Sequence, residues 1–284
     1  MKKKLAVCLT LITGLWSMES NAQVSNPNNA WSTGAYVGWN SASNLDFKLG
    51  TTPTQYMIID GTTNIGYVGI GTTTPSQKLT VTGGAMNVQT PTRSYMINGS
   101  KILWHNGDPT SIFAGVGAGA SAPASGSLYN TLVGRDAGTS LTTAQQNTFI
   151  GFEAGKSLVS SVYANVAVGY QALYSNTGWG RNTAVGYKAL YELNTACAPC
   201  EDGANLNTAV GYEAMYSTQV YGVCGLGYKA GHENKFGCYL IAVGEEAAFH
   251  NIDASANIAI GSGTLHKSRH FENNIALGHW SLIT

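Results

Sequence analysis

A short alternation of polar and apolar positions around a glycine is the most regular pattern in the chain. In the copy NTAVGY, residues 207–212, Thr208 and Val210 share one face of an extended chain with the tyrosine, while Ala209 shares the other face with the asparagine and the glycine. Alternation with a period of two, rich in β-branched residues, is typical of a β-strand. Each copy therefore predicts a short strand, followed by a glycine that serves a turn or a close backbone approach.

Ten copies of this pattern follow one another after residue 110. The clearest are NTLVGRDA, NTFIGFEA, NVAVGYQAL, NTAVGYKAL, NTAVGYEAM, NIAIGSGTL and NIALGHWSL, and weaker ones are SIFAGVGA, VCGLGYKA and LIAVGEEA. Their central glycines, separated by 19, 17, 18, 17, 25, 16, 17, 17 and 17 residues, are Gly115, Gly134, Gly151, Gly169, Gly186, Gly211, Gly227, Gly244, Gly261 and Gly278. A step near 17 residues is too short for repeats of two helices, which need more than about 30. It suits one coil of a parallel β-solenoid, with room for two short strands and two turns.

Stacked coils would place equivalent residues in columns along a rod of about ten coils, roughly 48 Å long. Asn lies four residues before the glycine in seven of the ten copies, which predicts a ladder of hydrogen-bonded side-chain amides. Alanine three residues after the glycine predicts a tight contact, within the coil or between chains, at Ala118, Ala137, Ala154, Ala172, Ala189, Ala214, Ala230 and Ala247. Coils this narrow enclose little apolar volume, so we expect three chains to associate around a common axis.

The N-terminal part of the chain lacks the repeat and predicts two further regions. Residues 1–22 combine a basic start, an apolar stretch too short to span a bilayer and small residues before Gln23. They predict a signal peptide cleaved near Ala22, and hence a secreted or outer-surface protein without membrane insertion. Residues 23–110 predict a smaller β-rich head or neck, and residues 111–284 the solenoid. We expect Trp31, Trp39 and Trp104 to be anchors of the head. Short strands are expected at Ile58 and Ile59 and at residues 78–81.

Composition narrows the range of functions. The chain carries 15 basic and 15 acidic residues, and removal of the signal peptide leaves it slightly acidic. This balance gives no electrostatic footprint for nucleic acid or an anionic membrane. Only 11% of residues are charged and 35 are glycine, whereas 44% are apolar, which favours short strands and tight turns over helices or disorder.

The NTAVGY repeat resembles the head repeats of the YadA-like trimeric autotransporter adhesins, which share Asn before an Ala-Val/Ile-Gly core. The resemblance implies a left-handed parallel β-roll, a homotrimer and an adhesive role at a cell surface. The period here is longer, so turn lengths must differ.

Residues 31–81 resemble an element that precedes such repeats in exported Bacteroidetes proteins and in tail-fibre-like proteins. The resemblance rests on AWSTG at 30–34, FKLGTTPTQYMIIDG at 47–61 and GIGTTTPSQKLTV at 69–81. It implies a fibrous protein and supplies no catalytic residues. Tail-fibre-like relatives often end in a self-cleaving chaperone and autotransporter adhesins in a stalk and anchor. Neither follows the tenth repeat, so we expect a truncated chain.

The cysteines leave several readings open. Cys197 and Cys200 lie in the insertion that lengthens one spacing to 25 residues, where a local disulfide or a reduced pair is favoured over zinc because a second CxxC is missing. A redox site would need a βαβ context. Cys224 and Cys238 fall on neighbouring coils, and a disulfide between them is one reading.

Aromatic residues also recur at fixed places. Residues directly after the glycine are Phe152, Tyr170, Tyr187, Tyr212 and Tyr228, and a second series is Tyr174, Tyr191 and Tyr216. We favour stacked rings that stabilise the solenoid, while Tyr170, Tyr187, Tyr212 and Tyr228 are also candidates for contact with a glycan or protein. His232, His250 and His266 fall five or six residues after their glycines, where surface turns are favoured over a metal or pH-sensitive column.

Two classes of function follow. The first is a non-enzymatic structural or adhesion protein that binds host or neighbour-cell proteins or glycans, with a phage-tail-fibre-like receptor-binding protein as a variant. The second is a β-helix enzyme acting on polysaccharide, which would be expected to have longer, irregular coils and clustered charges. The sequence therefore predicts no catalytic residues, no cofactor and no metal site.

Overall fold

A computed structural model describes residues 23–24, 36–39, 45–48, 55–60, 66–72, 74–82, 94–106, 109–123, 128–158, 163–176, 180–193 and 205–282. The chain divides into two compact units, residues 1–88 and 89–284, and each unit is described by itself. The predicted signal peptide, Trp31 and the pair Cys197 and Cys200 lie outside the described residues.

The first unit contains a small six-stranded sheet in chain order. Its strands are β1 (Gln23–Val24), β2 (Tyr36–Trp39), β3 (Leu45–Lys48), β4 (Gln55–Asp60), β5 (Tyr67–Ile70) and β6 (Leu79–Val81). Neighbouring strands are antiparallel except β5 and β6, which are parallel. The strands expected at Ile58 and Ile59 and near residue 80 are confirmed. Ile58 is buried, and its side chain fills the space over Gly69, where a Cβ would collide with it.

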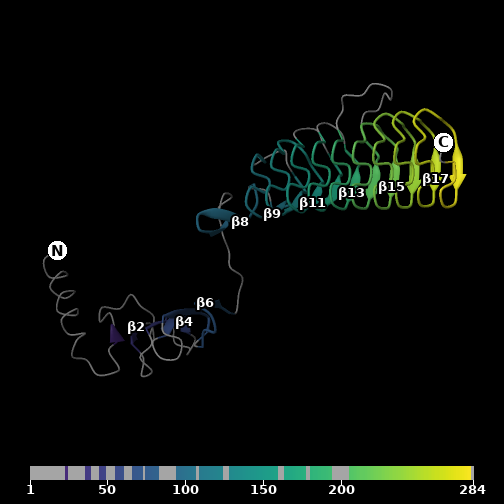
Figure 1. Ribbon diagram of the computed structural model, residues 1–284. Helices are drawn as coiled ribbons and strands as arrows, with labels where there is room; N and C mark the ends of the chain where they lie inside the picture. The colour runs from purple at the N-terminus through teal and green to yellow at the C-terminus, as the bar shows by residue number, and fades with distance from the viewer. Residues whose placement is uncertain are drawn as a thin grey trace. The chain divides into compact units, whose positions relative to one another are not determined.

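The second unit is a β-solenoid with a period of about 17 residues, as the glycine spacing predicts (Figure 1). A hairpin, β7 (Tyr95–Ile97) and β8 (Ser100–Trp104), pairs antiparallel with the first solenoid strand, so the solenoid sheet begins before residue 111, where the sequence placed its start. The parallel, in-register strands are β9 (Ile112–Ala114), β10 (Thr131–Val133), β11 (Thr148–Ile150), β12 (Val166–Val168), β13 (Thr183–Val185), β14 (Thr208–Val210), β15 (Cys224–Leu226), β16 (Ile241–Val243), β17 (Ile258–Ile260) and β18 (Ile275–Leu277).

Each coil has one three-residue strand whose middle residue points into the core. The expected second strand is wrong within the described residues, where the rest of each coil is built of turns apart from an isolated bridge between Gln145 and Tyr163. Around Gly186, the non-glycine residues Arg181, Lys188 and Leu190 have φ of 64°, 50° and 50°. Because an extended strand requires negative φ, Arg181 lies outside the strand on its N-terminal side, and Lys188 and Leu190 turn the chain back after the strand has ended.

The exposed Ala164 offers a test of how much a left-handed conformation lowers the free energy of unfolding. Its φ is 57°, so Ala164→Gly relieves about 1–2 kcal/mol of strain against an entropic loss of about 0.5–1 kcal/mol. We expect the free energy of unfolding to rise by about 0.5 kcal/mol in urea denaturation. The matched control Ala167→Gly, in the buried centre of β12, should lower it by about 1 kcal/mol. Equal losses in both variants would contradict this account.

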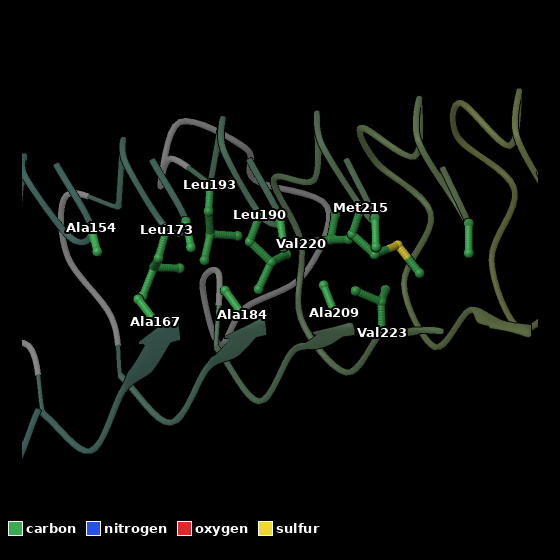
Figure 2. Close-up of a cluster of buried hydrophobic side chains, with 14 of the residues drawn as sticks. Ala154, Ala167, Leu173, Ala184, Leu190, Leu193, Ala209, Met215, Val220 and Val223 are labelled. Carbon is green, nitrogen blue, oxygen red and sulfur yellow. The ribbon is translucent and has the colours of Figure 1, made fainter. Parts of the chain in front are cut away.

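The core is a narrow strip of small and branched side chains between the strand and the returning segment of each coil (Figure 2). The recurring alanines, Ala118 to Ala247 in the series above, are all fully buried, so their tight contact is within the solenoid. Met215 is also fully buried, and its side chain occupies the space over Gly225, where neighbouring coils carry alanine. A larger residue thus compensates for a smaller one, which keeps the core filled.

The predicted asparagine ladder is confirmed. Asn165 donates from its backbone N and its Nδ2 to Oδ1 of Asn147, both at 3.0 Å, and accepts from the backbone N of Asn182 at 2.9 Å. The first coil has Ser111 in this column, whose Oγ accepts from the backbone N of Asn130 at 3.1 Å. These buried amides satisfy backbone groups that the strand ladder leaves unpaired.

Candidate functional site

The residues that follow the central glycines form a tyrosine ladder of five stacked rings, which is the arrangement favoured from the sequence. The ladder runs Phe152, Tyr170, Tyr187, Tyr212 and Tyr228, with ring centroids 5.1, 5.2, 4.9 and 5.4 Å apart and planes within 17° of parallel. The glycine before each ring lets consecutive backbones approach closely, and in-register pairing sets the spacing. The four tyrosines are 37–44% exposed.

The stacking determines how the tyrosine ladder can meet a ligand. Because each inner ring has both faces covered by its neighbours, only ring edges and hydroxyl groups are open to solvent. Lys188 lies 5.4 Å from the centroid of the Tyr187 ring and Lys229 lies 5.3 Å from that of Tyr228, so two ammonium groups accompany the hydroxyls. The ladder is therefore suited to hydrogen bonds and edge contacts with an extended partner, and unsuited to stacking against a planar ligand.

A second column of rings lies on the returning side of the coils and continues beyond the tyrosines predicted there. This ring column is made of Tyr174, Tyr191, Tyr216, His232, Phe249, His266 and Trp280. Centroid distances range from 4.9 Å between His232 and Phe249 to 5.6 Å between His266 and Trp280. Burial raises the pKa of both Tyr191 and Tyr216. His250 is one position out of this column and meets Phe249 and His266 by ring edges.

Four histidines face carboxylates of the preceding coil. His250 Nδ1 lies 2.5 Å from Glu233 and His270 Nδ1 lies 2.7 Å from Asp253. The other two pairs, His232 with Glu213 and His266 with Glu246, have Nε2–oxygen distances of 3.4 and 3.3 Å. These pairs place the histidines in contacts between coils. In the part of the chain that the structure describes, no group of three or more His, Cys, Asp or Glu side chains could hold a metal ion.

An outward face of the sheet is formed by the first and third residues of strands β9 to β18. In every one of these strands the middle residue is buried and both outer residues are partly or fully exposed. Its most exposed apolar members, 36–67% open, are Ile112, Val133, Ile150, Val166, Leu226, Ile241, Ile260, Ile275 and Leu277. The strand alternation that fills the core therefore also builds a long apolar surface.

The cysteine geometry corrects one reading of the sequence. Cys224 is a free thiol on the outward face, whereas Cys238 is nearly buried and disulfide-bonded. The suggested disulfide between these two residues is therefore wrong. They occupy different positions in their coils, because Cys224 begins strand β15 while Cys238 precedes β16 by three residues.

A hollow of about 240 Å³ opens beside the hairpin, where the Lys101 ammonium lies 4.4 Å from the centroid of the Trp104 ring. Trp104 also packs edge-on against Phe113 in the solenoid core, so it anchors the hairpin to the solenoid. Within the described residues, no helix is both long and apolar enough to cross a membrane.

The ring column beyond Tyr216 was not predicted from the sequence, because its residues change from Tyr to His and Phe, and its last ring, Trp280, comes only two residues after Gly278. The signal was present in the constant offset of five residues from the central glycine for His232, Phe249 and His266. Also not predicted was a second amide contact, Asn251 Nδ2 to Asn234 Oδ1 at 2.9 Å, seven residues after the glycine.

Comparisons with known proteins return no match, since no family model, no curated protein and no solved structure is similar enough to this chain. The likeness to adhesin heads and tail-fibre elements therefore rests on the quoted motifs alone.

Proposed function

We propose that this chain is an exported, non-enzymatic surface protein, and that its solenoid is a left-handed β-roll which assembles into a homotrimer and displays a rod for adhesion. The observation that carries the proposal is the outward face, whose third strand position is apolar in every strand from β9 to β18, on a solenoid that already has a filled core. The proposal places the outward faces of three copies against one another, and the signal peptide before Gln23 accounts for export.

The size of the outward face supports self-association. Ten strands spaced about 4.8 Å apart and about 10 Å wide give the outward face an area of roughly 480 Å². The largest contiguous apolar patch on a typical soluble monomer is about 300–600 Å², and such patches are often functional. A stable interface buries about 800 Å² per partner, which is of the same order. A second copy is the favoured occupant because its coils have the same rise, so its apolar columns match at every step.

Adhesion would then use surfaces outside the interface. Tyr170, Tyr187, Tyr212 and Tyr228 present hydroxyls and ring edges at intervals of about 5 Å, with Lys188 and Lys229 beside them. This arrangement is suited to a surface protein or glycan of a host or neighbouring cell. A receptor-binding fibre of the phage-tail type would use the same surface. The regular coils favour both over a polysaccharide-active enzyme.

Self-association is tested by charge on the outward face. In the chain without residues 1–22, we expect Ile150→Glu combined with Leu226→Glu to reduce the mass measured by light scattering from three chains to one. Both side chains are exposed in the single chain, so circular dichroism should be unchanged. Ser175→Glu, on the returning segment, adds charge elsewhere and should leave the assembly intact. A monomeric unmodified chain would refute the trimer and leave the solenoid standing.

A further inference from the structure

His232 occupies an unusual place inside the ring column. Its ring is stacked between Tyr216, 5.1 Å away, and Phe249, 4.9 Å away, with planes within 11° of parallel. Its Nε2 lies 3.4 Å from Glu213, while its Nδ1 is buried and has no hydrogen-bond partner among the described residues. A carboxylate only accepts hydrogen bonds, so the proton of the neutral ring belongs on Nε2. The lone pair of Nδ1 then faces the interior.

His266 repeats this arrangement two coils further on. Its ring stacks 5.4 Å from Phe249, its Nε2 lies 3.3 Å from Glu246, and its Nδ1 is likewise buried without a partner among the described residues. In both cases the carboxylate comes two residues after a central glycine and the histidine five residues after the next one. The same geometry at two places shows that it follows from the coil itself.

We propose that His232 and His266 form an acid-sensitive latch in the ring column, in which protonation of the two rings loosens the coils of β15 to β17. An imidazolium donates from both nitrogens, so protonation would place an N–H on each buried Nδ1 with no acceptor. It would also put a positive charge inside a stack of aromatic rings that is largely closed to water. The neutral rings impose neither penalty, so the latch holds near neutral pH and opens in acid.

The charged groups around the latch determine whether it loosens as the pH falls or as it rises. Burial lowers the pKa of His232, and Lys229 lowers it further, while Glu213 and Glu233 raise it without reversing the shift. His266 faces Glu246 and the edge of the His250 ring. A histidine with a lowered pKa stabilises the fold above its unfolded pKa of about 6.5. That stability is lost as the pH falls from about 6.5 through the lower pKa of the folded state.

The expected result is a local loss of protection in acid. Hydrogen exchange of the 23–284 chain, corrected for the intrinsic pH dependence, should rise about tenfold in β15 to β17 between pH 7.5 and 5.0, because an N–H buried without an acceptor destabilises the coils that enclose it. Protection of β10 to β12 should stay constant, because solenoid coils interact only with their neighbours. Unchanged exchange in β15 to β17 would overturn the proposal.

Variants separate the latch from other titrating groups. His232→Phe combined with His266→Phe should abolish the pH effect, because Phe249 shows that the column accepts phenylalanine. His270→Asn removes an exposed histidine paired with Asp253 and should leave the effect in place. If the double variant does not fold, NMR titration of the unmodified chain decides: the His232 ring should titrate below pH 6.5. Titration of the His232 ring at or above pH 6.5 would refute the latch.

Discussion

Replacement of Gly186 by alanine is expected to lower the free energy of unfolding by about 4 kcal/mol or more. Gly186 has φ of 134°, a conformation that residues with a Cβ rarely adopt, and a Cβ there would collide with the backbone carbonyl of Gly211 in the next coil. Because both obstacles are backbone, neither can be relieved by a side-chain rotation. Urea denaturation measures the loss, and hydrogen exchange should place it in β13 and β14.

Gly278 is a control within the same column. Its φ is 110°, yet a Cβ there meets nothing within 4 Å. Gly278→Ala should therefore cost only the backbone strain, about 1–2 kcal/mol. If the two substitutions lower stability equally, the close approach between coils contributes nothing and the explanation of the glycine column fails.

Replacement of Asn165 by alanine is expected to lower the free energy of unfolding by about 3 kcal/mol. The substitution removes the acceptor of the Asn182 backbone N–H, which is fully buried, and one donor to Asn147 Oδ1. An orphaned buried donor keeps its full desolvation penalty, which is why the loss exceeds that of an ordinary hydrogen bond. Denaturation in urea provides the measurement.

Asn165→Ser tests whether the acceptor matters more than the amide. Ser111 already fills this column in the first coil and accepts from the backbone N of Asn130. The serine variant should therefore recover about half of the loss. A serine variant as unstable as the alanine variant would show that the Nδ2 contact dominates, contrary to this account.

The repeat determined most of the fold because every coil meets its neighbours through the same residues. The alternation in Thr208-Ala209-Val210 predicted two faces of the strand, and the structure shows that the face of Ala209 is the buried one. The asparagine and alanine columns followed once equal spacing was taken as equal coils. The tyrosine ladder followed for the same reason. In-register parallel pairing turns a one-dimensional period into vertical columns, so no long-range information was needed.

Only the tertiary structure decided the backbone conformation of the turns between the strands. Lys188 and Leu190 have high intrinsic helix propensities, yet stacking on neighbouring coils holds both in left-handed conformations that their local sequence does not predict. The hairpin β7–β8 joined the solenoid sheet because Trp104 packs on Phe113, a contact beyond the repeat. The state of Cys224 and Cys238 and the pairing of the histidines with carboxylates likewise depend on where each residue lies in its coil. Contacts between coils are made by the side chains that face each other, and the period alone does not specify which ones do.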